Sequence, residues 1–137
     1  MTPFGEEPEF RLHVFVEPPV ALDENSNGPV RLVCISGGTV SGAVNGVILP
    51  GGTDWQNARP DGSTEIEARY LLELEEGARV ELQSRGLRAA GAAGFWSSMW
   101  LRTLSPGHSG LNSAQFLGLG RKEADGVKIS VFRLPAL

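Results

Sequence analysis

The sequence predicts an all-β protein, a single-domain antiparallel β-barrel with a central cavity. Several segments alternate apolar and polar residues with the two-residue period of strands. Glycine (18 residues) and proline (9 residues) are frequent in a chain of 137 residues, which indicates many tight turns between short strands. No segment has convincing helical spacing, and strands without covering helices bury their apolar faces best in a barrel or a sandwich.

One domain is expected, because a chain of this length can bury about two-thirds of its unfolded surface in a single core. Residues 1–8 are polar and contain proline, which predicts a flexible leader, with the barrel over 9–137. The first strand is predicted over 10–16, where apolar residues occupy every second position from Phe10 to Val16.

The remaining strands follow in order, separated by glycine, proline and acidic turn residues. Their predicted ranges are 30–36, 39–49, 65–74, 78–84, 95–103, 111–121 and 127–134. The segment 65–74 contains good helix formers, but it lacks helical spacing and ends at the turn Glu75-Glu-Gly77, so a hairpin is favoured. Gly37-Gly38 is expected to break the second strand, and the small residues of 86–94 to form a long loop that could close over an opening.

The net charge is −4, and the arginine and glutamate residues are scattered along the chain instead of forming a basic cluster. This argues against nucleic acid or an anionic membrane as a partner. No apolar run approaches the roughly 20 residues of a membrane helix, and the N-terminus has no signal-peptide pattern, so a cytoplasmic location is expected. The single cysteine, Cys34, is interpreted as a buried structural thiol, with a catalytic nucleophile as the alternative.

The chain has no phosphate-binding loop, dinucleotide fingerprint, zinc-binding helix motif or paired cysteines, so no cofactor is expected. His13 and His108 lie far apart in sequence and make a weak case for a metal, so no metal site is predicted. A nucleophilic serine also lacks its usual motif. Acid/base chemistry by carboxylates is therefore the better candidate.

The segment 49–62 carries more polar chemistry than a turn requires. Asp54, Trp55 and Gln56 lie close to Arg59 and Asp61, so a stacking surface, carboxylates, an amide and a guanidinium occur together. We interpret this segment as the lining of a small-molecule site. The alternative is a turn whose aspartates bond their own backbone and whose tryptophan plugs one end of the barrel.

A second candidate wall comes from the strand 95–103. Trp96, Trp100 and Arg102 fall on one of its faces, a combination typical of a pocket, since arginine can stack on an indole or pair with a carboxylate. The alternative is a packed core strand.

A carboxylate such as Asp54, Asp61 or Glu67, held beside tryptophan in an apolar barrel, would have its pKa raised by desolvation and could move protons near neutral pH. Arg69 or Arg102 could then hold an enolate or a carboxylate. On the pattern alone, Glu67 and Arg69 could instead be solvent-facing residues of an amphipathic strand.

Several motifs point to a known family. They are Gly37-Gly-Thr-Val-Ser-Gly42, Pro50-Gly-Gly-Thr-Asp-Trp-Gln56, Arg59-Pro-Asp-Gly62, Glu67-Ala-Arg-Tyr70, and the looser matches Glu75-Glu-Gly-Ala78, Ser84-Arg-Gly-Leu-Arg88 and Met99-Trp-Leu-Arg-Thr103. In these motifs the chain resembles the bacterial and fungal family called domain of unknown function 3237, which includes UPF0311-like proteins. The resemblance covers about Phe10 to Leu134.

The resemblance implies a small antiparallel β-barrel with a central cavity, often paired as a homodimer, and no particular reaction. The cavity residues that it implies are Asp54, Trp55, Arg69, Arg102 and Asn112. The chain departs from the family pattern at Glu76, where an aspartate is usual, and at Gly110, where a tryptophan is usual. The role of that tryptophan is therefore missing here or is taken by Trp96 or Trp100.

Together these observations predict a barrel that binds a small, mostly apolar, aromatic or polyketide-like metabolite and acts on it as a cofactor-free lyase, isomerase or cyclase. Asp54 is predicted to carry the proton, and Arg69 and Arg102 to hold an anion. The predicted substrate contacts are Trp55, Gln56, Glu67, Trp96, Trp100 and Asn112. The alternatives are a non-catalytic binding protein with the same pocket and a structural dimerisation module with a packed interior.

Overall fold

The computed structural model describes residues 7–23 and 28–137. Residues 1–6, which form most of the expected leader, and residues 24–27 lie outside the described residues. The elements within the described ranges are β1 (Phe10–Val16), β2 (Val20–Ala21), β3 (Val30–Gly42), β4 (Gly46–Ile48), β5 (Thr53–Ala58), β6 (Thr64–Leu74), β7 (Arg79–Arg88), β8 (Gly94–Thr103), the 3-10 helix η1 (Pro106–Ser113), β9 (Phe116–Glu123) and β10 (Gly126–Arg133).

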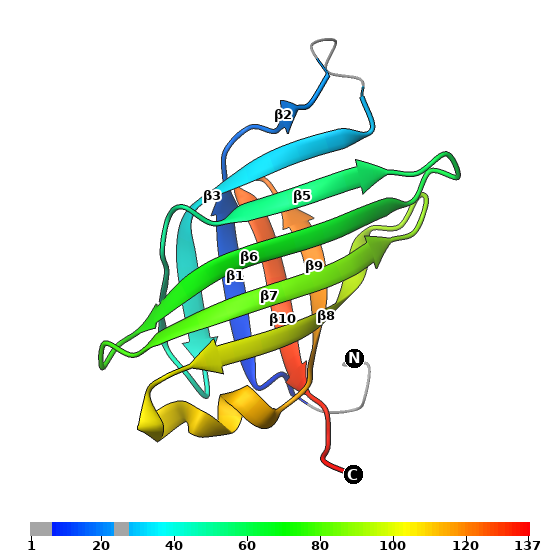
Figure 1. The fold of residues 1–137 in the computed structure, drawn as a ribbon. Coiled ribbons are helices and arrows are strands. Elements are labelled where there is room, and N and C mark those ends of the chain that lie inside the picture. The colour runs from blue at the N-terminus through cyan, green and yellow to red at the C-terminus, as the bar shows by residue number, and fades with distance from the viewer. Residues whose placement is uncertain (1–6, 24–27) are drawn as a thin grey trace.

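The strands form one antiparallel sheet that closes on itself (Figure 1). β1 pairs with both β10 and β3, which joins the first and last parts of the sheet. β4 and β5 each pair with β3 and β6, so together they occupy the place of one interrupted strand. Counted in this way, the closed barrel has eight strands. The prediction of an all-β antiparallel barrel is confirmed.

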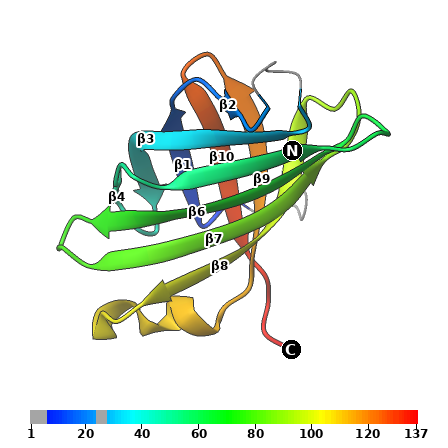
Figure 2. The ribbon, with the colours of Figure 1, turned by 45° about the horizontal axis from the view of Figure 1, so that its top comes forward.

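Alternation along each strand places its apolar residues inside the barrel. In Figure 2 the strands β6, β7 and β8 cross steeply over β1, β9 and β10. The inner faces of these two walls of the barrel meet in a core that includes Phe10, Leu12, Leu72, Leu82, Met99 and Phe116. The rings of Phe10 and Phe116 lie 6.0 Å apart between centroids. At one end of the barrel η1 lies across the opening, as Figure 1 shows, and its Leu111 is buried in the same core. The interior is thus filled and covered at this end.

The predicted break at Gly37-Gly38 is wrong, because β3 continues through both glycines to Gly42. They adopt φ values of +151° and +152°, which bend the strand while it keeps its pairing with β1. At Gly38 a Cβ atom would lie 2.1 Å from the carbonyl oxygen of His13. The two glycines therefore allow one continuous strand to turn a barrel corner.

The long loop predicted over 86–94 is also wrong. β7 continues to Arg88 and β8 begins at Gly94, which leaves a short connection over 89–93. The strand predicted over 111–121 begins only at Phe116, because residues 111–113 belong to η1. The first turn of η1 starts with a proline, a residue well suited to that position. Among residues 7–23 and 28–137 the structure contains no helix that is both long and apolar enough to span a membrane.

Candidate functional site

The end of the barrel away from η1 opens into a pocket of about 380 Å³. The ends of β7 and β9 and the beginnings of β3, β6, β8 and β10 contribute to it, together with the connection between β1 and β2. Its larger apolar lining residues include Val16, Val33, Ile66, Phe95 and Val127. A pocket of this size with a mainly apolar wall can accommodate a small organic molecule. We call it the mouth pocket.

Asp54 is the carboxylate on the inner face of β5 in this pocket. Its Oδ2 accepts a hydrogen bond of 3.1 Å from Nε2 of Gln56, and Oε1 of Gln56 accepts one of 2.9 Å from Nη2 of Arg31. Gln56 thus connects the carboxylate to a guanidinium. The second oxygen, Oδ1, is buried and has no hydrogen-bond partner within the described residues.

Burial raises the pKa of Asp54 from its ordinary 3.8 to about 6. The hydrogen bond from Gln56 and the charge of Arg31 act in the opposite direction, but they do not offset the desolvation. A carboxyl group with this pKa exchanges its proton close to neutral pH, which is the property that a general acid or base requires.

Tyr70 lies on the same inner surface and was not predicted as a site residue. Only 4% of it is exposed, and its hydroxyl has no hydrogen-bond partner within the described residues. Burial, and then the nearby charge of Asp54, raises the pKa of this phenol. Tyr70 therefore stays protonated, and it is close enough to respond to the charge of Asp54, although it does not line the mouth pocket. Ser97 on β8 carries a further buried hydroxyl without a partner in the described part of the chain.

The structure does not bring Arg69 and Arg102 together with Asp54, contrary to expectation. Both lie on the outer surface, where they bind Glu81: Arg69 Nη2 is 2.6 Å from Oε2 and Arg102 Nη2 is 2.8 Å from Oε1. The hydrogen bond from Arg69 is the main reason why the pKa of Glu81 lies below its usual range. In β5 and β6, Thr53 pairs with Arg69, and this puts Arg69 on the face opposite to Asp54.

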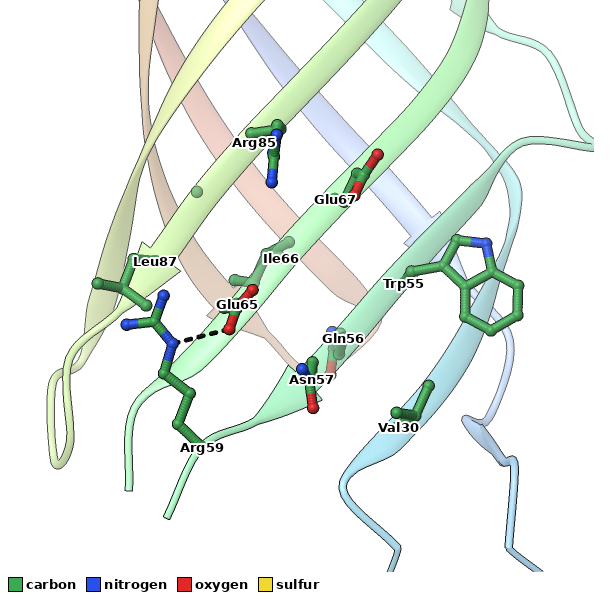
Figure 3. Close-up of a pocket in the computed structure, with 11 residues that line it drawn as sticks. Val30, Trp55, Gln56, Asn57, Arg59, Glu65, Ile66, Glu67, Arg85 and Leu87 are labelled. Atoms are coloured by element: carbon green, nitrogen blue, oxygen red, sulfur yellow. Dashed lines mark hydrogen bonds and ion pairs between the residues drawn. The ribbon is translucent and has the colours of Figure 1, made fainter. Parts of the chain in front are cut away.

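The three tryptophans expected to line the cavity lie on the outer surface. Trp55, Trp96 and Trp100 are 46%, 45% and 46% exposed. Trp55 and Glu67 border a separate groove of about 340 Å³ along β5, β6 and β7 (Figure 3), where Glu67 is paired in register with Arg85. This groove holds no buried carboxylate, so the mouth pocket is the better candidate site.

Asn112 lies in η1, at the covered end of the barrel. Its side chain accepts a hydrogen bond from the backbone N–H of Thr103 and donates one to the Thr103 carbonyl, at 2.7 Å and 2.9 Å. These bonds tie η1 to β8, so the role of Asn112 in the structure is to hold the helix in place. No group of three His, Cys, Asp or Glu side chains that could hold a metal ion occurs within residues 7–23 and 28–137.

Residues 5–134 match the family model described as Protein of unknown function (DUF3237). The chain belongs to this family. A UPF0311 protein of Clostridium acetobutylicum is 38% identical over 81 residues, which cover 58% of this chain and 51% of that protein. The chain spans about half the length of the curated relatives that it matches.

Solved structures show the same fold. A β-barrel-like protein from Acinetobacter baumannii has a TM-score of 0.85 and 30% identity, with 94% of each chain covered. A protein described as an enzyme from Penicillium herquei has a TM-score of 0.72 and 19% identity, with 91% of this chain and 92% of that one covered. At this level of identity the likeness to the second protein shows the fold alone.

Strand alternation divides the DUF3237 motifs between the two surfaces of the barrel. In the motif that ends at Gln56, Asp54 and Gln56 point inward and Trp55 points outward; in the motif that ends at Tyr70, the tyrosine is buried and Arg69 is exposed. The family motif therefore contributes both the carboxylate and the phenol of the interior. The sequence did contain a signal that Tyr70 is an interior residue. It occupies the same alternate positions of the strand as the apolar residues from Ile66 to Leu74.

Proposed function

We propose that this DUF3237 barrel binds a small, mostly apolar, aromatic or polyketide-like metabolite in the mouth pocket and acts on it by acid/base chemistry, as a cofactor-free lyase, isomerase or cyclase. The observation that supports this most strongly is the Asp54 carboxylate, with a pKa of about 6 and a buried, unpartnered oxygen beside a pocket of about 380 Å³. Strongly perturbed carboxylates in pockets are common at catalytic sites.

The proposed chemistry begins with ionised Asp54, which removes a proton from a carbon next to a carbonyl group. The electron pair of the broken C–H bond forms a C=C bond while the π pair of the carbonyl group moves to its oxygen, which gives an enolate. Asp54 then holds the proton and can return it at another position of the same molecule, which completes an isomerisation. Gln56 orients the carboxylate through its hydrogen bond to Oδ2.

Deuterium exchange would test this proposal without knowledge of the natural substrate. The purified protein is incubated in D₂O with aryl 1,3-diketones, β-keto lactones and aryl ketones, and exchange at carbon is followed by proton NMR against buffer blanks. We expect exchange of at least one class, at a rate that rises through about pH 6 and then levels off, because the ionised form of Asp54 is the base. Saturable binding without exchange would instead favour a non-catalytic binding protein.

We also propose that two copies associate through the outer surface of β8. Trp96 and Trp100 are both nearly half exposed there, and the neighbouring Arg102–Glu81 pair presents both signs of charge, which suits contact with a second copy of the same surface.

Sedimentation analysis of a Trp96→Arg variant is expected to show monomers where the unmodified chain shows dimers. Leu22→Arg, at an exposed position after β2 and several strands away from β8, is the control that should leave the dimer intact. A monomeric unmodified chain would contradict this.

A further inference from the structure

We propose that the ligand of the mouth pocket is an organic carboxylate with a flat apolar body, whose negative group binds the guanidinium groups of Arg31 and Arg88. This inference rests on the proposed function only in that it concerns the same pocket, and it makes a separate statement about the charge of the ligand. It replaces the outer residues Arg69 and Arg102 as the expected anion holders.

Arg31 and Arg88 are half-buried residues of the pocket wall, on β3 and β7. The described carboxylates, in 7–23 and 28–137, form no ion pair with either of them. By contrast, Arg69 and Arg102 on the outer surface each bind a carboxylate. The charge of Asp54, which Gln56 connects to Arg31, offsets only one of these two half-buried cations. Among the described residues the interior of the pocket therefore has an excess of positive charge, which is expected to attract an anion.

Both guanidinium groups also have donors to spare. Within the described part of the chain, Arg31 donates to Oε1 of Gln56 at 2.9 Å, and the side chain of Arg88 donates one long bond of 3.4 Å to Oγ1 of Thr64. A guanidinium has five N–H donors in a planar fork that matches the two oxygens of a carboxylate. Arginine is therefore the side chain best suited to bind a carboxylate here.

Asp54 is the other charged group inside the pocket, where it is set against the two guanidinium groups, and the remaining charges lie at the rim. Lys122, Glu123, Asp125 and Glu17 are all exposed, and Asp125 is bound to His13 outside the pocket at 2.9 Å. Exposed charges are screened by water and salt, so the rim carboxylates oppose a bound anion only weakly.

The shape of the pocket favours a ring system as the body of the ligand. Phe95 lies against Gly120, where a Cβ atom would come within 2.2 Å of its ring, so the aromatic side chain is packed against the wall and offers a rigid surface. Val16, Val33 and Ile66 supply further apolar contacts. A flat apolar molecule with one carboxylate matches this combination of surfaces.

Matched pairs of neutral and anionic compounds test the inference. Calorimetry would measure the affinities of 2-naphthoate and 2-naphthamide, and of benzoate and cinnamate with their amides, for the full chain. We expect the carboxylate of at least one pair to bind about tenfold more tightly than its amide, and this preference to weaken as salt is added. Equal affinities within every pair, or no binding of any member, would overturn the inference.

Variants identify the residues responsible. Arg88→Gln is expected to weaken carboxylate binding about tenfold while leaving amide binding unchanged, and the amide thereby reports that the pocket is still folded. Arg121→Gln removes an exposed arginine from the same end of the barrel and should change neither affinity. Because these are binding measurements, failure of the deuterium exchange would refute catalysis without affecting this result, and equal affinities would refute the anionic ligand without affecting catalysis.

Discussion

Replacement of Asp54 by asparagine is expected to slow the proposed deuterium exchange by about 10²–10⁴-fold, the range typical of a positioned general base. The amide has nearly the shape of the carboxylate and can still accept the hydrogen bond from Gln56, but it cannot take up a proton from carbon. The loss should appear mainly in kcat, with KM little changed, because the walls of the pocket remain in place. Initial exchange rates across the active pH range would measure both.

Glu75→Gln is the matched control for this substitution. It removes one carboxylate in the same way, but from the exposed turn between β6 and β7, where Glu75 has no role in the pocket. Its exchange rate should equal that of the unmodified chain. If the Asp54 variant retained a rate within a few fold of the control, Asp54 would not be the base.

The same Asp54→Asn variant is expected to be more stable than the unmodified chain at pH 8, by up to about 3 kcal/mol. In the folded barrel, burial raises the pKa of Asp54 to about 6, while the unfolded chain has the ordinary value of 3.8. Each pKa unit corresponds to about 1.4 kcal/mol, so the ionised carboxylate destabilises the fold by about 3 kcal/mol above both values. Asparagine carries no such charge.

The direction of the pKa shift of Asp54 determines how the free energy of unfolding depends on pH. A raised pKa in the folded state makes the protonated barrel the more stable form below about pH 4, and that stability is lost as pH rises through about 6. Urea unfolding at several pH values should therefore show a gain from the substitution that is small near pH 4 and complete above about pH 7. Tyr70, which interacts electrostatically with Asp54, stays protonated throughout this range because burial raises its pKa. A pH-independent difference would show that Asp54 is not desolvated in the folded protein.

Slower exchange and higher stability of the Asp54→Asn variant would together show that the carboxylate proposed as the base also destabilises the folded protein. A barrel with asparagine at this position would fold more stably at neutral pH and would lack the base. Functional sites commonly contain groups that the fold alone would not favour, and a buried carboxylate with an unpartnered oxygen is such a group.

The fold could be predicted largely from local patterns. The alternation from Phe10 to Val16 predicted β1 and its buried face, and the turn Glu75-Glu-Gly77 predicted the hairpin of β6 and β7. The break expected at Gly37-Gly38 was wrong because a glycine that interrupts a strand and a glycine that bends one have the same sequence signal. Pairing with β1, which lies far away in sequence, decides between the two.

The candidate site could be predicted only in part. No strand was predicted over 50–64, so the alternation within β5 was not used to separate Asp54 and Gln56 from Trp55. Arg31 and Arg88 were not recognised, since they come from β3 and β7 and meet at the same pocket only when the barrel closes. Conversely, Asn112 was expected in the cavity but lies at the covered end.

The sequence by itself determined which residues share a face of a strand, because the two-residue period follows from backbone geometry alone. It correctly placed Trp96, Trp100 and Arg102 together. Which of the two faces points inward was decided only by the tertiary structure. The opposite face of β8, with Met99 and Leu101, fills the core, and the curvature of the closed sheet leaves the tryptophans and the arginine outside. The same closure enclosed Asp54 and thereby raised its pKa.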